Sequence, residues 1–396
     1  MGRDVIDRSK KGKNKMELIE FAQRKSEQRL RKAHMNDLMN MEHSKKINRS
    51  NATVKEFADV LGLDTVYVST SGGKDSAVLS KLCTNLYPEI KHIMFDTGLE
   101  YKASIELAKS QGAEIIPPKT SWVRSCEKHG YPVVSKNVSR RLHDIGRTPI
   151  GTLNALFNKV YGLSNKWLHL TSKEFIDFPI SGYCCTEFKK NPSKRTKLNP
   201  IIATRIEESN ARKSAWKKSG CNSYSNDGKH GVSRPLSLWK DKDIDLYIKD
   251  ENVALSALYT QYEQKRTGCK ICPYGAQLDG SRFDLLKQLE PKAYDYFINK
   301  TKLGYILMIS GVDILSDIDY MFRKNIVEQD IEHWRSQNNK NNYLDYRCQR
   351  ALEEFDYDQL IDALNHLISV GTKFMYSADD IKAKLKELNQ IGGRKE

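Results

Sequence analysis

The chain has 396 residues, more than one ordinary core holds, so we expect an α/β core domain that carries additional helical segments. Hydrophobic residues make up 39% of the chain, and no run of them is long enough to cross a bilayer, which excludes an integral membrane protein. The 65 Lys and Arg residues outnumber the 50 Asp and Glu residues, and the net charge of +15 favours nucleotides or nucleic acid as partners.

We expect the protein to be cytoplasmic. Its N-terminal segment is rich in Lys and Arg but lacks the apolar stretch of a secretory signal. Two of its eight cysteines are adjacent and two have Cys-x-x-Cys spacing, which fits a metal site in a reducing compartment better than a disulfide framework.

Alternating strand and helix patterns predict the fold. A β-branched strand leads into a glycine turn and an amphipathic helix, and the same order then repeats. This alternation predicts a Rossmann-like, doubly wound, mostly parallel sheet that binds ligands at the carboxyl ends of its strands. The expected elements are, in chain order, helix 51–63, strand 65–70, helix 75–86, strand 92–95, helix 100–111, strand 114–116, helix 135–147, and strands 178–181 and 200–205.

We expect three parts along the chain. Residues 1–50 are basic and favour helix, with only a thin apolar stripe, and predict an appended arm. Residues 51–311 contain the strand–helix alternation and every motif described below. Residues 312–396 have mixed charge and predict a helical C-terminal region without a chemical motif. The α/β fold is therefore expected to carry helical extensions at both ends.

The first motif is a glycine turn, Ser71-Gly72-Gly73-Lys74-Asp75-Ser76, between the first strand and its helix. Its amides can surround an anion at the positive end of that helix. Glycine permits the close approach, while Lys74 and Ser76 add a charge and a hydroxyl donor. The spacing is not that of a Walker A loop. The alternative is an ordinary glycine-containing turn between a strand and a helix.

A second candidate is formed by Arg205, Glu208 and Arg212. The two arginines have the chemistry to hold a phosphate or sulfate by paired hydrogen bonds, with Glu208 orienting one guanidinium. The alternative is a solvated helix face, on which Arg and Glu commonly occur together.

The third candidate is a set of four cysteines: Cys184, Cys185, Cys269 and Cys272. Each pair can present two thiolates to one metal centre. Four thiolates suit either a 4Fe–4S cluster or a structural zinc ion. We expect the remaining cysteines, Cys83, Cys126, Cys221 and Cys348, to be packing residues.

The glycine turn resembles the PP-loop of the adenine nucleotide alpha hydrolases, which include ATP pyrophosphatases, tRNA thiolases and phosphoadenylylsulfate (PAPS) reductases. Three later segments resemble the PAPS reductase branch: 95–101, 205–212 with its Arg-x-x-Glu-Ser-x-x-Arg pattern, and 235–239. The glycine that precedes that pattern in the family is Thr204 here. These four matches run from residue 71 to residue 239, and residues 1–50 and 312–396 remain outside the resemblance.

The cysteine pattern is similar to that of cluster-bearing adenylylsulfate reductases and related sulfurtransferases, including those of DNA phosphorothioation and reductase-like proteins carried by phages. Residues 266–273 match the family's Arg-x-Gly-Cys-x-x-Cys-Pro. The resemblance implies ATP or PAPS as the bound nucleotide and favours 4Fe–4S over zinc at the four cysteines. It implies nucleotide binding by Ser71, Gly72, Gly73, Lys74, Asp75, Ser76, Asp96, Thr97 and Gly98, and catalytic roles for Lys74, Asp75, Arg205, Glu208 and Arg212.

Three functions remain open from the sequence. The first is ATP-dependent sulfur transfer to a nucleic-acid or small acceptor, with a partner protein that donates sulfur or electrons. The second is reduction of PAPS or adenylylsulfate to sulfite. Cys348 is the only cysteine after Cys272, and it lacks the family's Glu-Cys-Gly-Leu-His-like setting, which weakens this second reading. The third is a non-catalytic nucleotide- or redox-sensing nucleic-acid binder.

Overall fold

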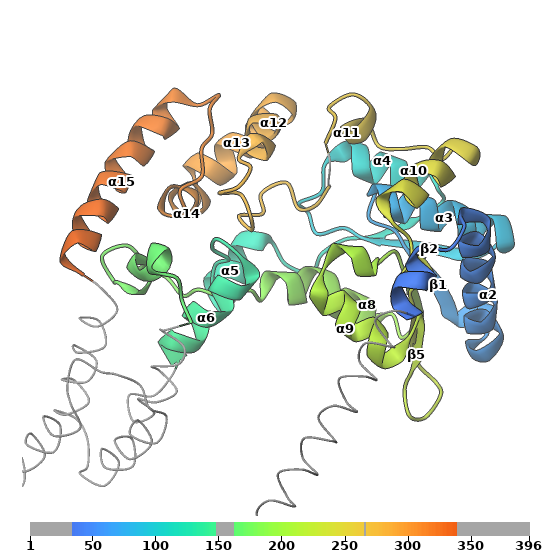
Figure 1. Ribbon diagram of the computed structural model, residues 1–396. Coiled ribbons are helices and arrows are strands. Elements are labelled where there is room, and N and C mark those ends of the chain that lie inside the picture. Colours follow the sequence, from blue (N-terminus) through green and yellow to red (C-terminus); the bar gives the residue numbers. More distant parts are fainter. Residues whose placement is uncertain (1–33, 148–161, 265–266, 339–396) are drawn as a thin grey trace, which may run out of the picture. The chain divides into compact units, whose positions relative to one another are not determined.

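The computed structural model describes residues 34–147, 162–264 and 267–338 (Figure 1). The predicted arm before residue 34, Arg266, Cys348 and the C-terminal region after residue 338 lie outside the described residues. The chain divides into two compact units. Unit 1 comprises Met1–Phe95, Lys102–Ile116 and Ser193–Thr267, and unit 2 comprises Asp96–Tyr101, Pro117–Pro192 and Gly268–Glu396.

Unit 1 contains a six-stranded, mostly parallel sheet, which confirms the predicted α/β fold. Its strand order is β3-β2-β1-β4-β6-β5, and only β5 runs antiparallel to its neighbour. The strands are β1 (Val66–Ser69), β2 (Lys91–Phe95), β3 (Glu114–Ile116), β4 (Asn199–Ile202), β5 (Asn222–Tyr224) and β6 (Gly231–Ser233).

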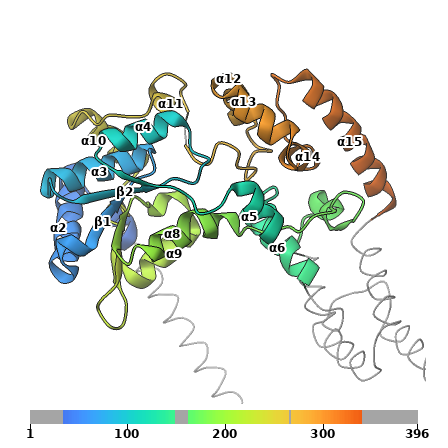
Figure 2. The same cartoon turned by 180° about the vertical axis from the view of Figure 1, so that it is seen from behind.

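Helices lie on both faces of this sheet. Val66 and Val68 of β1 join an apolar cluster with helices α2, α3 and α10 on one face, and these helices lie beside the strands in both views (Figures 1 and 2). Tyr67 points to the other face, where its hydroxyl bonds to the Ser193 hydroxyl of α8 at 2.8 Å. The helices of this unit are α2 (His43–Leu61), η1 (Leu63–Thr65), α3 (Lys74–Leu86), α4 (Lys102–Ser110), η4 (Ile206–Glu208), α9 (Asn210–Ser219), α10 (Asp241–Asp250) and α11 (Ala257–Thr260), while α8 (Asn191–Arg195) crosses the division between the units.

The helix predicted over 51–63 begins earlier, at His43, so the expected arm boundary at residue 50 falls inside α2. Its first half is held by polar contacts with the segment that leads into α10. Lys46 pairs with Asp243, and both side chains are almost fully buried. Ser50 donates to the Pro235 carbonyl at 2.8 Å and accepts from the Trp239 indole at 2.9 Å. Residues 43–50 are therefore part of the sheet domain.

One strand prediction is wrong, and one hairpin was not predicted. The strand predicted over 178–181 is wrong, because only a single bridge joins Ile180 to Tyr131 there. Pro179 has no N–H to donate, so the segment cannot continue a ladder. The β5–β6 hairpin was not predicted, because each strand has three residues and shows no apolar alternation.

The described part of unit 2 is built mainly of helices. It has an apolar interior formed by α12, α14 and the start of α15, and the Tyr320 hydroxyl donates to the Val312 carbonyl at 2.9 Å within it. The helices are α5 (Trp122–His129), α6 (Lys136–Arg147), η2 (Asn165–Thr171), η3 (Thr186–Lys190), α12 (Ser281–Leu289), α13 (Pro291–Tyr294), η5 (Asp295–Asn299), α14 (Leu303–Ile309) and α15 (Ile318–Gln337).

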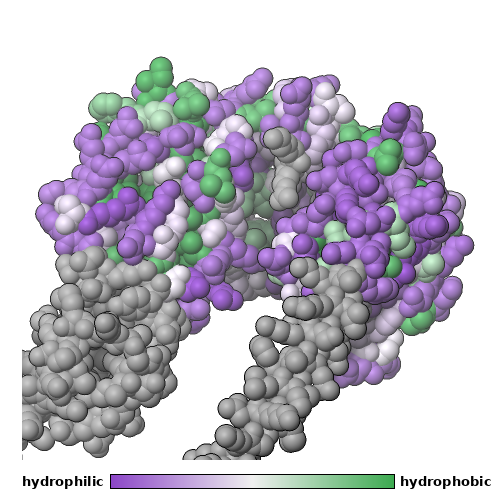
Figure 3. All heavy atoms as spheres, viewed as in Figure 1, coloured by the Kyte–Doolittle hydropathy of each residue, from purple (hydrophilic) through white to green (hydrophobic). Residues whose placement is uncertain are grey.

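No helix among the described residues combines the length and the apolar character that crossing a bilayer requires. The face drawn in Figure 3 is covered mainly by hydrophilic residues, with small, separate hydrophobic patches.

The buried Lys46–Asp243 pair yields a stability prediction. Lys46→Met keeps most of the side-chain volume but leaves the Asp243 carboxylate buried without its ammonium partner. We expect the free energy of unfolding in urea to fall by about 3 kcal/mol. The control is Lys45→Met, whose side chain is 70% exposed, and it should change stability by less than about 0.5 kcal/mol. Equal, small effects of the two variants would contradict the structural role of residues 43–50.

Candidate functional site

The strand order of unit 1 reverses between β1 and β4. From β1 the chain goes to β2 on one side of the sheet centre, whereas β4 pairs with the other edge of β1. Ser69 is level with Ile202 at the carboxyl ends of these parallel strands. The loops that follow β1 and β4 therefore leave the sheet side by side, and such a reversal is where open α/β sheets bind ligands.

The glycine turn after β1 has a backbone that only glycine can supply. Gly72 has φ +68°, and a Cβ there would lie 2.5 Å from the Ser104 carbonyl oxygen of α4. Gly73 is the N-cap of α3 and has no side chain to occupy the first amides of that helix. The positive end of α3 is therefore presented at the reversal of strand order.

Hydrogen bonds shape this turn without occupying all of its amides. Ser76 donates to the Gly73 carbonyl at 2.8 Å and accepts from the Ser71 amide at 3.2 Å. Within the described part of the chain, the structure gives no acceptor for the amides of Gly72 and Gly73. The turn thus offers two N–H groups to an anion.

One amide of the turn already has a partner that the sequence did not reveal. The Tyr259 hydroxyl accepts from the Lys74 amide at 3.1 Å, and Thr267 bonds to the same hydroxyl at 3.0 Å. Tyr259 belongs to none of the motifs, and Thr267 occupies an unspecified position of the motif at residues 266–273. An anion that used all the amides of the turn would have to displace the Tyr259 hydroxyl from Lys74.

The Lys74 ammonium pairs with Asp245 of α10 at 2.9 Å. The Lys74 side chain is 26% exposed and that of Asp245 is 62% exposed. Because exposed ion pairs contribute little stability, an anionic ligand can compete with Asp245 for this ammonium.

Arg205, predicted to hold an anion, is surrounded by carboxylates. Its guanidinium donates to Asp75 at 2.7 Å, to Asp241 at 2.7 Å and to Glu207 at 3.1 Å, and its side chain is only 7% exposed. Burial works against the charge, but the ion pairs outweigh it and raise the pKa of Arg205. The residue joins the loops that follow β1 and β4, and Asp75 is its partner in the glycine turn.

Arg212 and Glu208 form the predicted contact between a carboxylate and a guanidinium. Glu208 also accepts from the Arg205 amide at 3.1 Å, which places it between the two arginines. Arg212 lies in the first turn of α9 and its side chain is 40% exposed. Of the two predicted arginines, it is therefore the one that solvent reaches.

The four predicted metal-binding cysteines all belong to unit 2. The thiols of Cys184 and Cys185 share a hydrogen bond, which raises the pKa of Cys184 and lowers that of Cys185. Burial raises the pKa of Cys269 to about 12 and also raises that of Cys272. Cys272 additionally raises the pKa of Cys184, so the two pairs lie within electrostatic reach of each other.

Lysines surround these thiols. The negative charge of the Cys269 thiolate raises the pKa of Lys189, which lies in η3 directly after the Cys184–Cys185 pair. Lys136, and after it Lys189 and Lys190, also lower the pKa of Cys185. Lys136 is far from the cysteines in sequence, and no motif indicated it.

The segment Asp96–Gly98, predicted to bind nucleotide, belongs to the same unit as the cysteines. The Thr97 hydroxyl lies 3.9 Å from the Cys269 sulfur and donates to the Glu100 carboxylate at 3.1 Å. Asp96 accepts from the Gly98 amide at 2.8 Å and so closes the turn after β2. The structure therefore places Thr97 in contact with a predicted metal ligand.

The donor chemistry of the cysteine group suits a thiolate-bound metal. All four thiols are free and half-buried, and cations lie around them. Their positions do not form a finished ligand shell, since the described residues contain no group of three or more His, Cys, Asp or Glu side chains arranged to hold a metal ion.

No protein-family model matches the chain, and no curated protein matches it. Among solved structures, the phosphate complex of PAPS reductase from Candida auris is 14% identical over 60% of this chain and 94% of its own, with a TM-score of 0.34. The U34-tRNA thiolase NcsA from Methanococcus maripaludis, with its 4Fe–4S cluster, is 15% identical over 69% of this chain and 82% of its own, with a TM-score of 0.28. At these values neither overlap assigns a family or a function to this chain.

The shape of the glycine turn is tested by comparing Gly72→Ala with Gly112→Ala. Both glycines have positive φ, but a Cβ at Gly112 would meet nothing within 4 Å. Gly112→Ala should therefore lose only the backbone strain of about 1 kcal/mol in unfolding free energy. Gly72→Ala should lose clearly more, because its Cβ overlaps the backbone of α4. Equal losses in urea unfolding would show that Gly72 is not packed against Ser104.

Proposed function

We propose that this chain is an enzyme of sulfur metabolism that binds an adenine nucleotide and uses ATP to transfer sulfur to an acceptor. The observation that carries the proposal is the glycine turn at the reversal of strand order, with two amides and the Lys74 side chain available to an anion. The resemblance of residues 71–76 to the PP-loop supports a nucleotide as that anion.

The residues around the turn divide into two roles. The amides of Gly72 and Gly73, the Lys74 ammonium and the Ser76 hydroxyl would hold the phosphates. We assign Arg205 a positioning role, because each of its three guanidinium nitrogens already donates to a carboxylate. It would fix Asp75, and with it the turn, against the loop that follows β4. Arg212, with its exposed side chain, is the better candidate for an anion.

The four cysteines of unit 2 support sulfur chemistry. We propose that they hold a 4Fe–4S cluster, with zinc as the alternative, because four free thiols within electrostatic reach suit either centre. Lys136, Lys189 and Lys190 would favour the deprotonated thiols that ligation requires.

The nucleotide site is tested with Lys74→Ala. Loss of the ammonium should weaken binding of ATP about tenfold in isothermal titration calorimetry, because a hydrogen bond to a charged group is removed. The matched control is Lys81→Ala, which lies on the same helix and outside the turn. Unchanged affinity of Lys74→Ala would contradict the assignment of the turn.

The reaction is tested by comparing ATP with PAPS as substrates of protein purified without oxygen. Release of pyrophosphate or AMP from ATP would support sulfur transfer through an activated acceptor. Release of sulfite from PAPS, dependent on thioredoxin, would support the reductase instead. Tight, salt-sensitive binding of nucleic acid without any product would support the non-catalytic binder.

The metal site is tested with Cys184→Ser, which should lose most of the bound metal. Cys221→Ser is the control, because Cys221 is also a half-buried free thiol but lies in unit 1. Iron and acid-labile sulfide are measured on both proteins. Full metal content in Cys184→Ser would contradict the four-cysteine set, and zinc without sulfide in the wild type would replace the cluster by zinc.

A further inference from the structure

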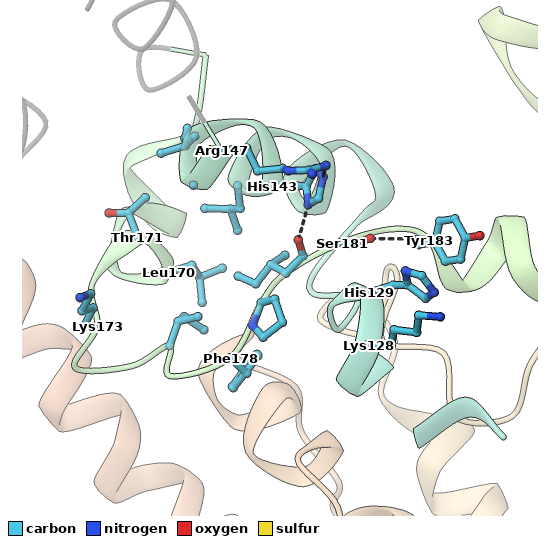
Figure 4. A pocket seen from close by; sticks show the side chains of 16 residues that line it. Lys128, His129, His143, Arg147, Leu170, Thr171, Lys173, Phe178, Ser181 and Tyr183 are labelled. Atoms are coloured by element: carbon cyan, nitrogen blue, oxygen red, sulfur yellow. Dashed lines mark hydrogen bonds between the residues drawn. The ribbon is translucent and has the colours of Figure 1, made fainter. Parts of the chain in front are cut away.

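Unit 2 contains a pocket that none of the motifs predicted. Its volume is about 720 Å³, within the range of small-molecule sites, and its walls come from α5, α6, η2 and the segment 176–183 (Figure 4). Apolar side chains, among them Leu142, Leu170 and Phe178, line part of the cavity. The pocket lies wholly within one unit.

The described side chains of this pocket that can carry a charge at neutral pH are all basic. The described lining includes Lys128, His129, His143, Arg147 and Lys173, and it contains no Asp or Glu. Like charges gathered around one cavity repel one another and attract an anion. For Lys128 and Lys173 the structure gives no ion-pair partner among the described residues, so both ammonium groups are available to a ligand.

Arg147 is held in place by a histidine. The Nδ1 of His143 donates to the Ile180 carbonyl at 2.9 Å, which leaves Nε2 as an acceptor for the Arg147 guanidinium at 3.3 Å. Only one of the guanidinium nitrogens is used in this contact, so its other N–H groups can reach an anion. The arrangement fits a phosphate, which Arg binds through two parallel hydrogen bonds.

An aromatic pair lines the same pocket. The rings of His129 and Tyr183 lie 4.1 Å apart between centroids at an angle of 36°, and Figure 4 shows both beside Lys128. Aromatic side chains near basic groups are the combination by which proteins hold unstacked bases and their phosphates. Tyr183 is followed directly by Cys184, so a base held here would lie near the thiols of the proposed metal site.

From these contacts we infer that this pocket binds a nucleotide, with the phosphate at Arg147 and the base against the His129–Tyr183 pair. Lys128, beside that pair, and Lys173, on the opposite side of the cavity, add positive charge around the ligand (Figure 4). This second nucleotide site is distinct from the glycine turn and belongs to the acceptor. The acceptor role rests on the proposed function, whereas the binding itself does not. The nucleotide is either free or part of a nucleic-acid strand, and the two sources share the same chemistry.

The test compares two triple variants with equal loss of charge. The pocket variant is Lys128→Gln/Arg147→Gln/Lys173→Gln, and the control is Lys119→Gln/Arg124→Gln/Lys292→Gln, three exposed residues of the same unit outside the pocket. The probes are AMP and a fluorescent single-stranded oligoribonucleotide of about ten nucleotides, titrated over a range of salt. Thermal unfolding of each variant checks that it is folded.

The pocket variant should bind at least one probe roughly tenfold more weakly than the control variant. For the oligoribonucleotide, the slope of log affinity against log salt concentration should fall by the amount that corresponds to about two to three phosphate contacts. Tyr183→Ala should also weaken binding roughly tenfold, and Tyr183→Phe should restore it, because the ring rather than the hydroxyl holds the base. Loss for the oligoribonucleotide alone identifies a strand as the ligand, and loss for AMP identifies a free nucleotide.

Equal affinities of the pocket and control variants for both probes would overturn the inference. ATP binding is measured on the same proteins together with Lys74→Ala. Failure of the proposed function would appear as oligoribonucleotide binding that depends on the pocket while ATP binding does not depend on Lys74. Failure of the pocket inference would appear as ATP binding that depends on Lys74 while oligoribonucleotide binding does not depend on the pocket residues.

Discussion

The ion pairs of Arg205 hold together the part of unit 1 on which the candidate nucleotide site depends. Its guanidinium joins Asp75, in the turn after β1, to Asp241, at the start of α10, and to Glu207, in the loop after β4. The two loops are brought level by the register of β1 and β4, but backbone pairing ends where the strands end. Beyond that point, a buried cation shared by three carboxylates is what keeps the glycine turn and its neighbours in one arrangement.

Unit 2 gathers chemistry of a different kind. The four thiols, the lysines that act on their pKa values and the Thr97 hydroxyl all belong to this unit. So does a basic pocket whose lining includes Tyr183, the residue before Cys184. A thiol group needs nearby cations to become a ligand or a nucleophile at neutral pH, and a phosphate-bearing acceptor needs cations to bind. Under the two proposals, the surplus of Lys and Arg would have two local uses in this unit, besides its effect on the charge of the whole protein.

The sequence predicted the parallel sheet because each strand and helix between residues 65 and 116 has a clear local pattern, and it predicted the glycine turn because glycine is required at Gly72. It did not predict what depends on distant residues. Tyr259 contacts Lys74 across 185 positions of sequence. Arg205 is a residue type suited to binding an anion, but its guanidinium is paired with carboxylates of this chain. Residues 1–50 were assigned to an appended arm because their apolar stripe is thin, whereas Lys46 within them pairs with Asp243, which lies 197 positions away. The roles of the four cysteines and of the glycine turn remain predictions.

The central claim is that the backbone amides of the glycine turn bind the phosphates of a nucleotide. It is tested most directly by the amide resonances of Gly72 and Gly73 in protein labelled with ¹⁵N-glycine, assigned by substitution and followed during titration with ATP. Hydrogen bonds from these two amides to phosphate should move both proton resonances downfield in a saturable manner, to a larger extent than the resonance of Gly112. If ATP bound while both resonances stayed in place, the nucleotide would lie elsewhere and the account of this site would be wrong.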